Sequence, residues 1–162
     1  MKKTLYLLRH AKSSWKDFSL SDFDRPLNKR GKHDAPFMAE KMKEKGIQPD
    51  SIISSPAKRA KRTAKIFSDV LEAPLFLEAK LYEADIKEML WIIQKAFETQ
   101  DEVMIVGHNP ELTYLNEILS DKEIFNIPTA GIVAITFDAY PIQENKGKQL
   151  FFDYPKKYGE KR

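Results

Sequence analysis

Short, continuous apolar runs alternate along the chain with longer segments in which apolar residues recur at helical spacing. An apolar run that stops at a polar cluster is typical of a buried strand, whereas apolar residues three and four positions apart predict an amphipathic helix. We therefore expect buried strands at residues 4–8, 51–54, 75–77 and 102–106. Helices are expected at residues 29–45, 57–71, 86–97 and 110–119. Two later strands, 132–137 and 149–152, flank a turn at 145–147 and predict a hairpin.

Proline marks two of the expected helices. Pro36 lies inside the pattern over 29–45, so this helix either kinks there or begins near Asp34 with the proline in its first turn. In the helix over 110–119, Pro110 occupies the first position and Asn109 is the expected N-cap.

The order of the elements indicates the fold class. A strand followed by a helix occurs four times before the two final strands, which predicts an α/β three-layer sandwich with a mainly parallel central sheet flanked by helices. The chain has 162 residues, and we find no repeat, low-complexity tract or linker in it. One domain over residues 1–162 is therefore expected, with a short C-terminal tail from about residue 155 that either contacts a partner or is mobile.

Composition narrows the class of protein. Hydrophobic residues make up 42% and charged residues 31%, and the net charge is only +3, which gives no general case for nucleic-acid binding. The absence of cysteine excludes disulfides, thiolate metal sites and a cysteine nucleophile. The apolar run at 4–8 is too short for a signal-peptide core or a membrane span, so we expect a cytoplasmic protein with no membrane partner.

Polar clusters follow three of the predicted strands. Arg9 and His10 follow the first, residues 54–59 the second, and residues 107–110 the fourth. In an open parallel sheet, ligands bind beyond the carboxyl ends of the strands. Two of the three histidines, His10 and His108, fall in these clusters. The sequence thus predicts that they face one site.

The residue types in these clusters suit phosphoryl transfer. The planar fork of an arginine matches phosphate oxygens, and a neutral imidazole is a competent nucleophile toward phosphorus. Nearby arginines would disfavour protonation of that imidazole, and a second histidine could donate to a phosphate oxygen. Positioning and cationic donors can carry most of such a reaction. The helix beginning near Asn109 would add a positive dipole end.

Plainer interpretations stay open from the residues alone. Either histidine could be structural, and His33 is interpreted as a surface residue. Arg59 could lie on a solvated helix face, because it is surrounded by Lys58, Lys61, Arg62 and Lys65. His10 and His108 could bind a metal, although no third ligand has metal-site spacing.

Taken together, the motifs resemble those of a known family. The chain is similar to the histidine phosphatase superfamily, the phosphoglycerate-mutase-like group, and within it to the short phosphohistidine phosphatase branch. The resemblance runs in order from about residue 3 to residue 138. It is carried by the segments 8–15 (LRHAKSSW), 24–31 (DRPLNKRG), 54–64 (SSPAKRAKRTA), 106–110 (VGHNP) and 128–131 (PTAG).

The resemblance implies a role for each matching residue. His10 would be the phosphorylated nucleophile, Arg9 and Arg59 would clamp the phosphate oxygens, and His108 would complete the pocket. No metal or organic cofactor would be required. The implied substrate-binding positions are Ser13, Thr129 and Ala130.

Glu83 matches the region where many relatives carry a proton donor; the alternative is a carboxylate that caps the helix beginning near Ile86. The sequence also departs from the family pattern. Ala11 replaces the usual glycine, and Lys16 replaces an asparagine of mutase-like members, which weakens any carry-over of sugar-phosphate contacts. Residues 78–101 leave no room for the insertion that covers the site in larger relatives.

These features lead to a specific functional prediction. An open site favours a bulky or protein-borne phosphate, and a phosphohistidine leaving group needs little help from a general acid. We therefore expect a hydrolase that forms a covalent phosphohistidine on His10 and acts on phosphohistidine in a protein. The alternatives are a broad phosphomonoesterase or small-metabolite phosphatase, and a non-catalytic phosphate-binding module. Nothing in the sequence points to a particular oligomeric state.

Overall fold

The computed structural model describes residues 2–159. A six-stranded sheet with the order β3-β2-β4-β1-β5-β6 forms its centre. The strands are β1 (Lys3–Arg9), β2 (Ser51–Ser54), β3 (Leu75–Leu77), β4 (Glu102–Gly107), β5 (Ile132–Phe137) and β6 (Lys148–Asp153). Strands β1 to β4 pair in parallel, whereas β5 pairs antiparallel with both β1 and β6. The mainly parallel sheet and the C-terminal hairpin are therefore confirmed.

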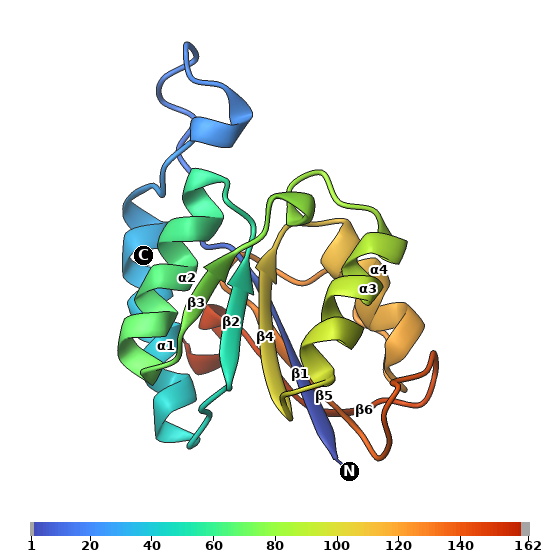
Figure 1. Ribbon diagram of the computed structural model, residues 1–162. Coiled ribbons are helices and arrows are strands. Elements are labelled where there is room, and N and C mark those ends of the chain that lie inside the picture. Colours follow the sequence, from blue (N-terminus) through green and yellow to red (C-terminus); the bar gives the residue numbers. More distant parts are fainter. Residues whose placement is uncertain (1, 160–162) are drawn as a thin grey trace.

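Helices cover both faces of this sheet. They are α1 (Lys29–Glu44), α2 (Lys58–Leu71), α3 (Ile86–Phe97) and α4 (Glu111–Leu119), with short 3-10 turns η1 (Asp22–Asp24), η2 (Ala79–Leu81) and η3 (Pro155–Tyr158). Helices α1 and α2 lie on one face and α3 and α4 on the other (Figure 1). This arrangement is the predicted three-layer sandwich, and each predicted helix and strand agrees with the observed one to within one residue at either end.

Two hydrophobic cores explain why the central strands are apolar without alternation. Tyr6 and Leu8 of β1 pack into the core under α1 and α2. Leu5 and Leu7 pack into the core under α3 and α4. Because successive side chains of a strand point to opposite faces, a strand with a helical layer on each side must be apolar at every position.

Helix α1 begins at its cap and not at the proline. The Asn28 side chain accepts a hydrogen bond from the Gly31 N–H (2.8 Å), so the alternative start near Asp34 is wrong. Pro36 lies inside the helix, where it cannot donate to the carbonyl of Lys32. Burial of the surrounding apolar face, which includes Ala35, Met38 and Ala39, offsets that loss.

Helix α4 begins one residue later than expected. Pro110 is its N-cap, and not Asn109. The Asn109 side chain still accepts hydrogen bonds from the backbone N–H and the hydroxyl of Thr113 (3.2 and 2.9 Å). The asparagine therefore satisfies a backbone N–H in the first turn of α4 although it lies outside the helix.

Part of the C-terminal tail packs on the domain. Pro155 is buried, and the Tyr158 ring meets Phe37 of α1 edge-on, with ring centroids 5.9 Å apart. Lys157 and Tyr158 both donate hydrogen bonds to the buried carboxylate of Asp153. Among residues 2–159, no helix is both long enough and apolar enough to cross a lipid bilayer.

Candidate active site

The carboxyl edge of the sheet carries a polar cavity of about 390 Å³. Register explains why the predicted clusters meet there: Arg9 of β1 lies opposite Gly107 of β4, and Ser54 of β2 lies opposite Val106. The long segment between β1 and α1 stands over the same edge (Figure 1). The cavity is lined by Arg9, His10, Lys12, Ser13, Trp15, Asp22, Arg59, His108, Asn109 and Thr129.

The His10 imidazole is neutral and has a defined tautomer. Its Nδ1 lies 2.7 Å from the Ala11 carbonyl oxygen, which can only accept, so Nδ1 carries the proton. Nε2 is then unprotonated, and its lone pair accepts a long hydrogen bond from the Arg59 Nε (3.4 Å). Burial is the main cause that lowers the pKa of His10 to about 3, with smaller contributions from His108, Arg59 and Arg9. The ring is therefore uncharged at neutral pH.

Arg59 is buried at the first turn of α2, with 8% of its surface exposed, so the solvated-face interpretation is wrong. Its two terminal nitrogens donate to the backbone oxygen and the carboxylate of Asp22 (2.7 and 3.0 Å). These bonds turn the Nε edge of the guanidinium toward His10.

Arg9 faces the cavity with an unsatisfied donor. One terminal nitrogen donates to the Ile127 carbonyl (3.0 Å). Within the described residues, the buried Nε has no hydrogen-bond partner. Burial, and then the charge of Arg59, lower the pKa of the Arg9 guanidinium, although an arginine stays charged at neutral pH. The Arg9 Nε–H is buried and unpartnered, and the guanidinium groups of Arg9 and Arg59 are both positive. Such a donor suits an anionic ligand.

His108 lies beside His10 in the cavity, and the centroids of the two imidazoles are 5.2 Å apart. Its Nδ1 faces an Arg59 terminal nitrogen (3.4 Å), which can only donate, so Nε2 carries the proton toward the Ser55 hydroxyl (2.8 Å). Burial, followed by the charge of Arg59, lowers the pKa of His108 to about 4.

Asp22 and Tyr82 belong to the site although the sequence did not single them out. The Asp22 carboxylate accepts from Arg59 and from the Tyr82 hydroxyl (3.0 and 2.7 Å). Burial alone would raise the pKa of Asp22, but the hydrogen bonds from Tyr82 and Arg59 lower it. The Tyr82 ring also meets the His108 ring edge-on at 5.6 Å. These partners are so far apart along the chain that no local pattern reveals them.

The predicted substrate-binding residues divide into two kinds. Ser13 and Thr129 line the cavity. Ala130 is buried instead, with a positive φ of 60°, and its N–H points at the carbonyls of Arg9 and His10 (3.1 Å each). It therefore holds the end of β1 in place.

Glu83 is exposed and is not among the residues that line the cavity. The alternative role as a helix cap is wrong, because Asp85 caps α3 by accepting from the Glu88 N–H (2.8 Å). The proton-donor role of Glu83 stays a prediction.

Two close contacts hold the segment after His10, which we call the catalytic loop, against helices α1 and α2. A Cβ on Gly31 of α1 would lie 2.2 Å from the Lys12 oxygen, so only glycine lets the loop pack there. Thr63 of α2 accepts from the Ala11 N–H (3.0 Å) and donates to the Arg59 carbonyl (2.8 Å). The threonine thereby ties the segment after His10 to the helix that carries Arg59.

Two guanidinium groups and a neutral imidazole at the carboxyl edge of an α/β sheet form an arrangement that suits an anionic ligand such as phosphate. The family model of the histidine phosphatase superfamily (branch 1) matches residues 5–104. The chain therefore belongs to the histidine phosphatase superfamily. Among residues 2–159 there is no group of three or more His, Cys, Asp or Glu side chains placed to hold a metal ion.

Individual relatives agree with this assignment. A SixA protein from Agrobacterium tumefaciens has a similar structure (TM-score 0.81, 27% identity), and the match covers 94% of this chain and 98% of that one. The protein histidine phosphatase SixA complexed with tungstate shares the fold (TM-score 0.84, 22% identity, 96% and 99% covered). An uncharacterised chloroplastic protein of Arabidopsis thaliana is 35% identical over a stretch that covers 75% of this chain. The same stretch covers 61% of the length of that relative.

Proposed function

We propose that this protein is a phosphatase that forms a covalent phosphohistidine on Nε2 of His10 and acts on phosphohistidine in a protein. The observation that carries the proposal is the unprotonated Nε2 of a neutral imidazole, which accepts only a long hydrogen bond (3.4 Å) from the buried guanidinium of Arg59. The unpartnered Nε of Arg9 supplies a second donor in the same cavity.

The first step transfers the phosphoryl group. The Nε2 lone pair forms a bond to phosphorus while the bond from phosphorus to the leaving nitrogen of the substrate breaks, and that nitrogen keeps the electron pair and takes a proton from solvent. Arg9 and Arg59 would hold the phosphoryl oxygens and offset their charge. A phosphate dianion would raise the pKa of His108, so this residue could donate to an oxygen from Nδ1.

The second step returns the site to its starting state. Water attacks the phosphorus, and the bond to Nε2 of His10 breaks so that Nε2 recovers its electron pair. Inorganic phosphate leaves with one proton of the water, and the other proton returns to solvent, which replaces the proton taken up in the first step. Throughout both steps Nδ1 keeps its proton and donates it in a hydrogen bond to the Ala11 carbonyl, so Nε2 stays the reacting atom.

Two features support a phosphohistidine substrate on a protein. Between β3 and α3 the chain forms only the short turn η2, so no inserted domain covers the cavity. The carboxylate that lines the cavity, Asp22, is engaged by Arg59 and Tyr82 and has a lowered pKa, which makes it a weak proton donor. A phosphoramidate bond suits such a site because its leaving nitrogen needs less protonation than an alkoxide.

A parallel comparison of wild type and His10→Ala tests the proposal. With a histidine-phosphorylated protein and a panel of phosphorylated metabolites, we expect wild type to have its highest kcat/KM on the protein. Rapid quenching should trap phosphate on wild type in an acid-labile form that His10→Ala lacks. His33→Ala is the matched control, since His33 lies outside the cavity, and it should keep both activity and label.

Other outcomes would select the alternatives. Higher efficiency on the metabolites would favour a small-metabolite phosphatase or a broad phosphomonoesterase. Phosphate binding without label or turnover would favour a non-catalytic phosphate-binding module.

A further inference from the structure

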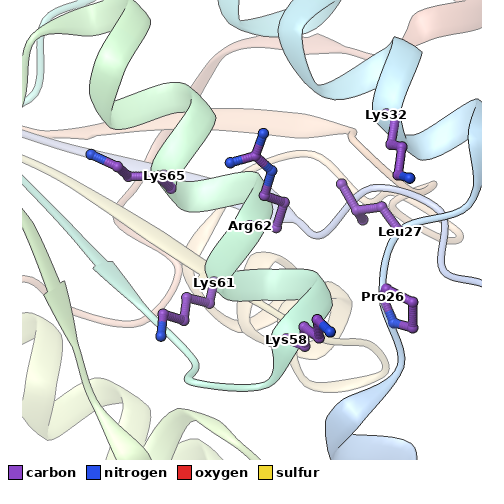
Figure 2. A pocket seen from close by; sticks show the side chains of 7 residues that line it. All are labelled: Pro26, Leu27, Lys32, Lys58, Lys61, Arg62 and Lys65. Carbon is purple, nitrogen blue, oxygen red and sulfur yellow. The ribbon is translucent and has the colours of Figure 1, made fainter.

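A second hollow, the basic groove, lies beside the active site. It has a volume of about 510 Å³ and runs between the first turns of α1 and α2 and the segment that joins the catalytic loop to α1 (Figure 2). It is lined by Pro26, Leu27, Lys32, Lys58, Lys61, Arg62 and Lys65, and no acidic side chain among residues 2–159 lines it.

Helix periodicity places four of these cations on one face. Positions 58, 61, 62 and 65 follow the spacing of three and four that brings side chains to the same side of a helix. The opposite side of α2, which carries Ala60, Ala64 and Phe67, is buried in the core. All four line the groove, and Lys32 of α1 lies across it from Arg62, while the side-chain ends of Lys61 and Lys65 point away from Lys32 (Figure 2).

The charge in the groove is largely uncompensated. Within residues 2–159, Lys65 is the one lining cation with an ion pair, to Asp69 at 2.9 Å. Lys32, Lys58, Lys61 and Arg62 are all exposed. Since the whole chain carries only +3, five cations in one hollow concentrate positive potential locally. Like charges this close repel one another, and an anionic partner would relieve that repulsion.

The wall of the groove is apolar as well as basic. Leu27 is buried to 4% exposure and pairs with Ser13 through an isolated β-bridge. Ser13 lines the catalytic cavity, and Lys58 directly precedes Arg59 in α2. The groove and the cavity are therefore adjacent, because paired or consecutive residues line one and the other. Apolar wall atoms between cations fit acidic side chains interleaved with apolar ones better than they fit a free phosphate.

We infer that the basic groove docks an acidic segment of the phosphorylated protein substrate while the phosphohistidine occupies the catalytic cavity. This inference rests on the proposed function for the nature of the substrate. Attraction between opposite charges would speed encounter and fix the orientation of the substrate. It should therefore lower KM and raise kcat/KM more than it changes kcat.

Charge reversal in the groove tests this. The double variant Lys61→Glu/Arg62→Glu leaves Arg59 and its contacts in place. The substrates are two phosphohistidine peptides that differ only in a flanking block, alternating Asp and Leu in one and Asn and Leu in the other. We expect wild type to prefer the acidic peptide by about tenfold in kcat/KM, with a preference that falls as salt rises. The variant should lose that preference and keep its kcat/KM on the neutral peptide within about twofold.

The control is Lys87→Glu/Lys146→Glu, which makes the same change in net charge at two exposed lysines outside the groove. It should keep the preference. An equal loss in both variants would overturn the inference in favour of net charge, and so would equal wild-type rates on the two peptides. Competition by an RNA oligonucleotide, but not by the unphosphorylated acidic peptide, would overturn it in favour of nucleic-acid binding.

Binding of the unphosphorylated acidic peptide separates this inference from the proposed function. If neither phosphopeptide is turned over, the proposed function fails. Docking then still stands if wild type binds the acidic peptide and the groove variant binds it at least about tenfold more weakly, and it falls if the two bind alike.

Discussion

At the scale of single residues, the site depends on two histidines that burial keeps uncharged. Their pKa values of about 3 and 4 lie far below the value of an exposed imidazole, and desolvation is the largest cause for both His10 and His108. In the proposed mechanism the attack on phosphorus requires a neutral His10 ring, because only the neutral ring has a lone pair. The same burial makes the native state sensitive to acid.

The pH dependence of stability follows from these lowered pKa values. An unfolded histidine has a pKa of about 6.5, so below this pH the unfolded chain binds protons while the two native histidines stay neutral. The free energy of unfolding therefore falls as the pH drops toward 4. Each histidine should contribute a loss of about 2 kcal/mol between pH 6.5 and 5. Urea denaturation at both pH values measures this. His10→Gln should reduce the slope and His33→Gln should not; equal slopes in all three proteins would contradict the assignment.

A second residue-scale prediction concerns Asp22, whose carboxylate accepts from Arg59 at 3.0 Å at the edge of the cavity. Asp22→Asn removes a negative charge beside the expected phosphate position, so inorganic phosphate should bind about three to ten times more tightly at low salt. Competitive inhibition by phosphate measures the effect. Asp24→Asn on the same turn is the control and should change little. Weaker binding by Asp22→Asn would show that Asp22 acts mainly by orienting Arg59.

At the scale of elements, the site depends on how α2 is tied to β1. Thr63 makes this link by bonding both the Ala11 N–H and the Arg59 carbonyl from a fully buried position. The helix therefore cannot shift along the strand without breaking a buried hydrogen bond, and the relative position of His10 and Arg59 depends on it.

Thr63→Val should test that link. Valine has a similar shape but leaves the Ala11 N–H unsatisfied, so the free energy of unfolding should fall by about 1–3 kcal/mol. Turnover should also fall, because the hydrogen bond that fixes the position of His10 relative to Arg59 is lost. Thr136→Val is the control, a buried threonine of β5 away from the cavity. It should lose stability without a change in kcat, and a Thr63→Val protein with unchanged kcat would contradict the role of the link.

At the scale of the whole molecule, chain topology gathers chemistry from distant segments. Parallel pairing of β1, β2 and β4 aligns three strand ends at one edge, and the 128–131 turn closes the site from the other side of β1. The basic groove adjoins this edge, and its five lining cations exceed the net charge of +3 that the whole chain carries.

Much of this could be predicted from local patterns. Continuous apolar runs reveal a strand that is buried on both faces, and helical spacing reveals a buried stripe, so the elements and their order follow from residues close in sequence. The start of α1 could not be decided in this way, because Pro36 fits either a kinked helix from residue 29 or a helix that begins near Asp34. The hydrogen bond from the Gly31 N–H to the Asn28 side chain decides for the earlier start.

The sequence by itself determined the fold class, the strand-end positions of His10 and His108 and the resemblance to the histidine phosphatase family. Only the tertiary structure decided the contacts across the site. The bonds from Asp22 to Arg59 and Tyr82 span 37 and 60 residues, and the neutral state of His10 is a consequence of burial. The tertiary structure also separated Arg59, which turns inward, from the neighbouring cations that line the groove. The physical reason is that desolvation and hydrogen bonding depend on what lies nearby in space, and local patterns report only what lies nearby along the chain.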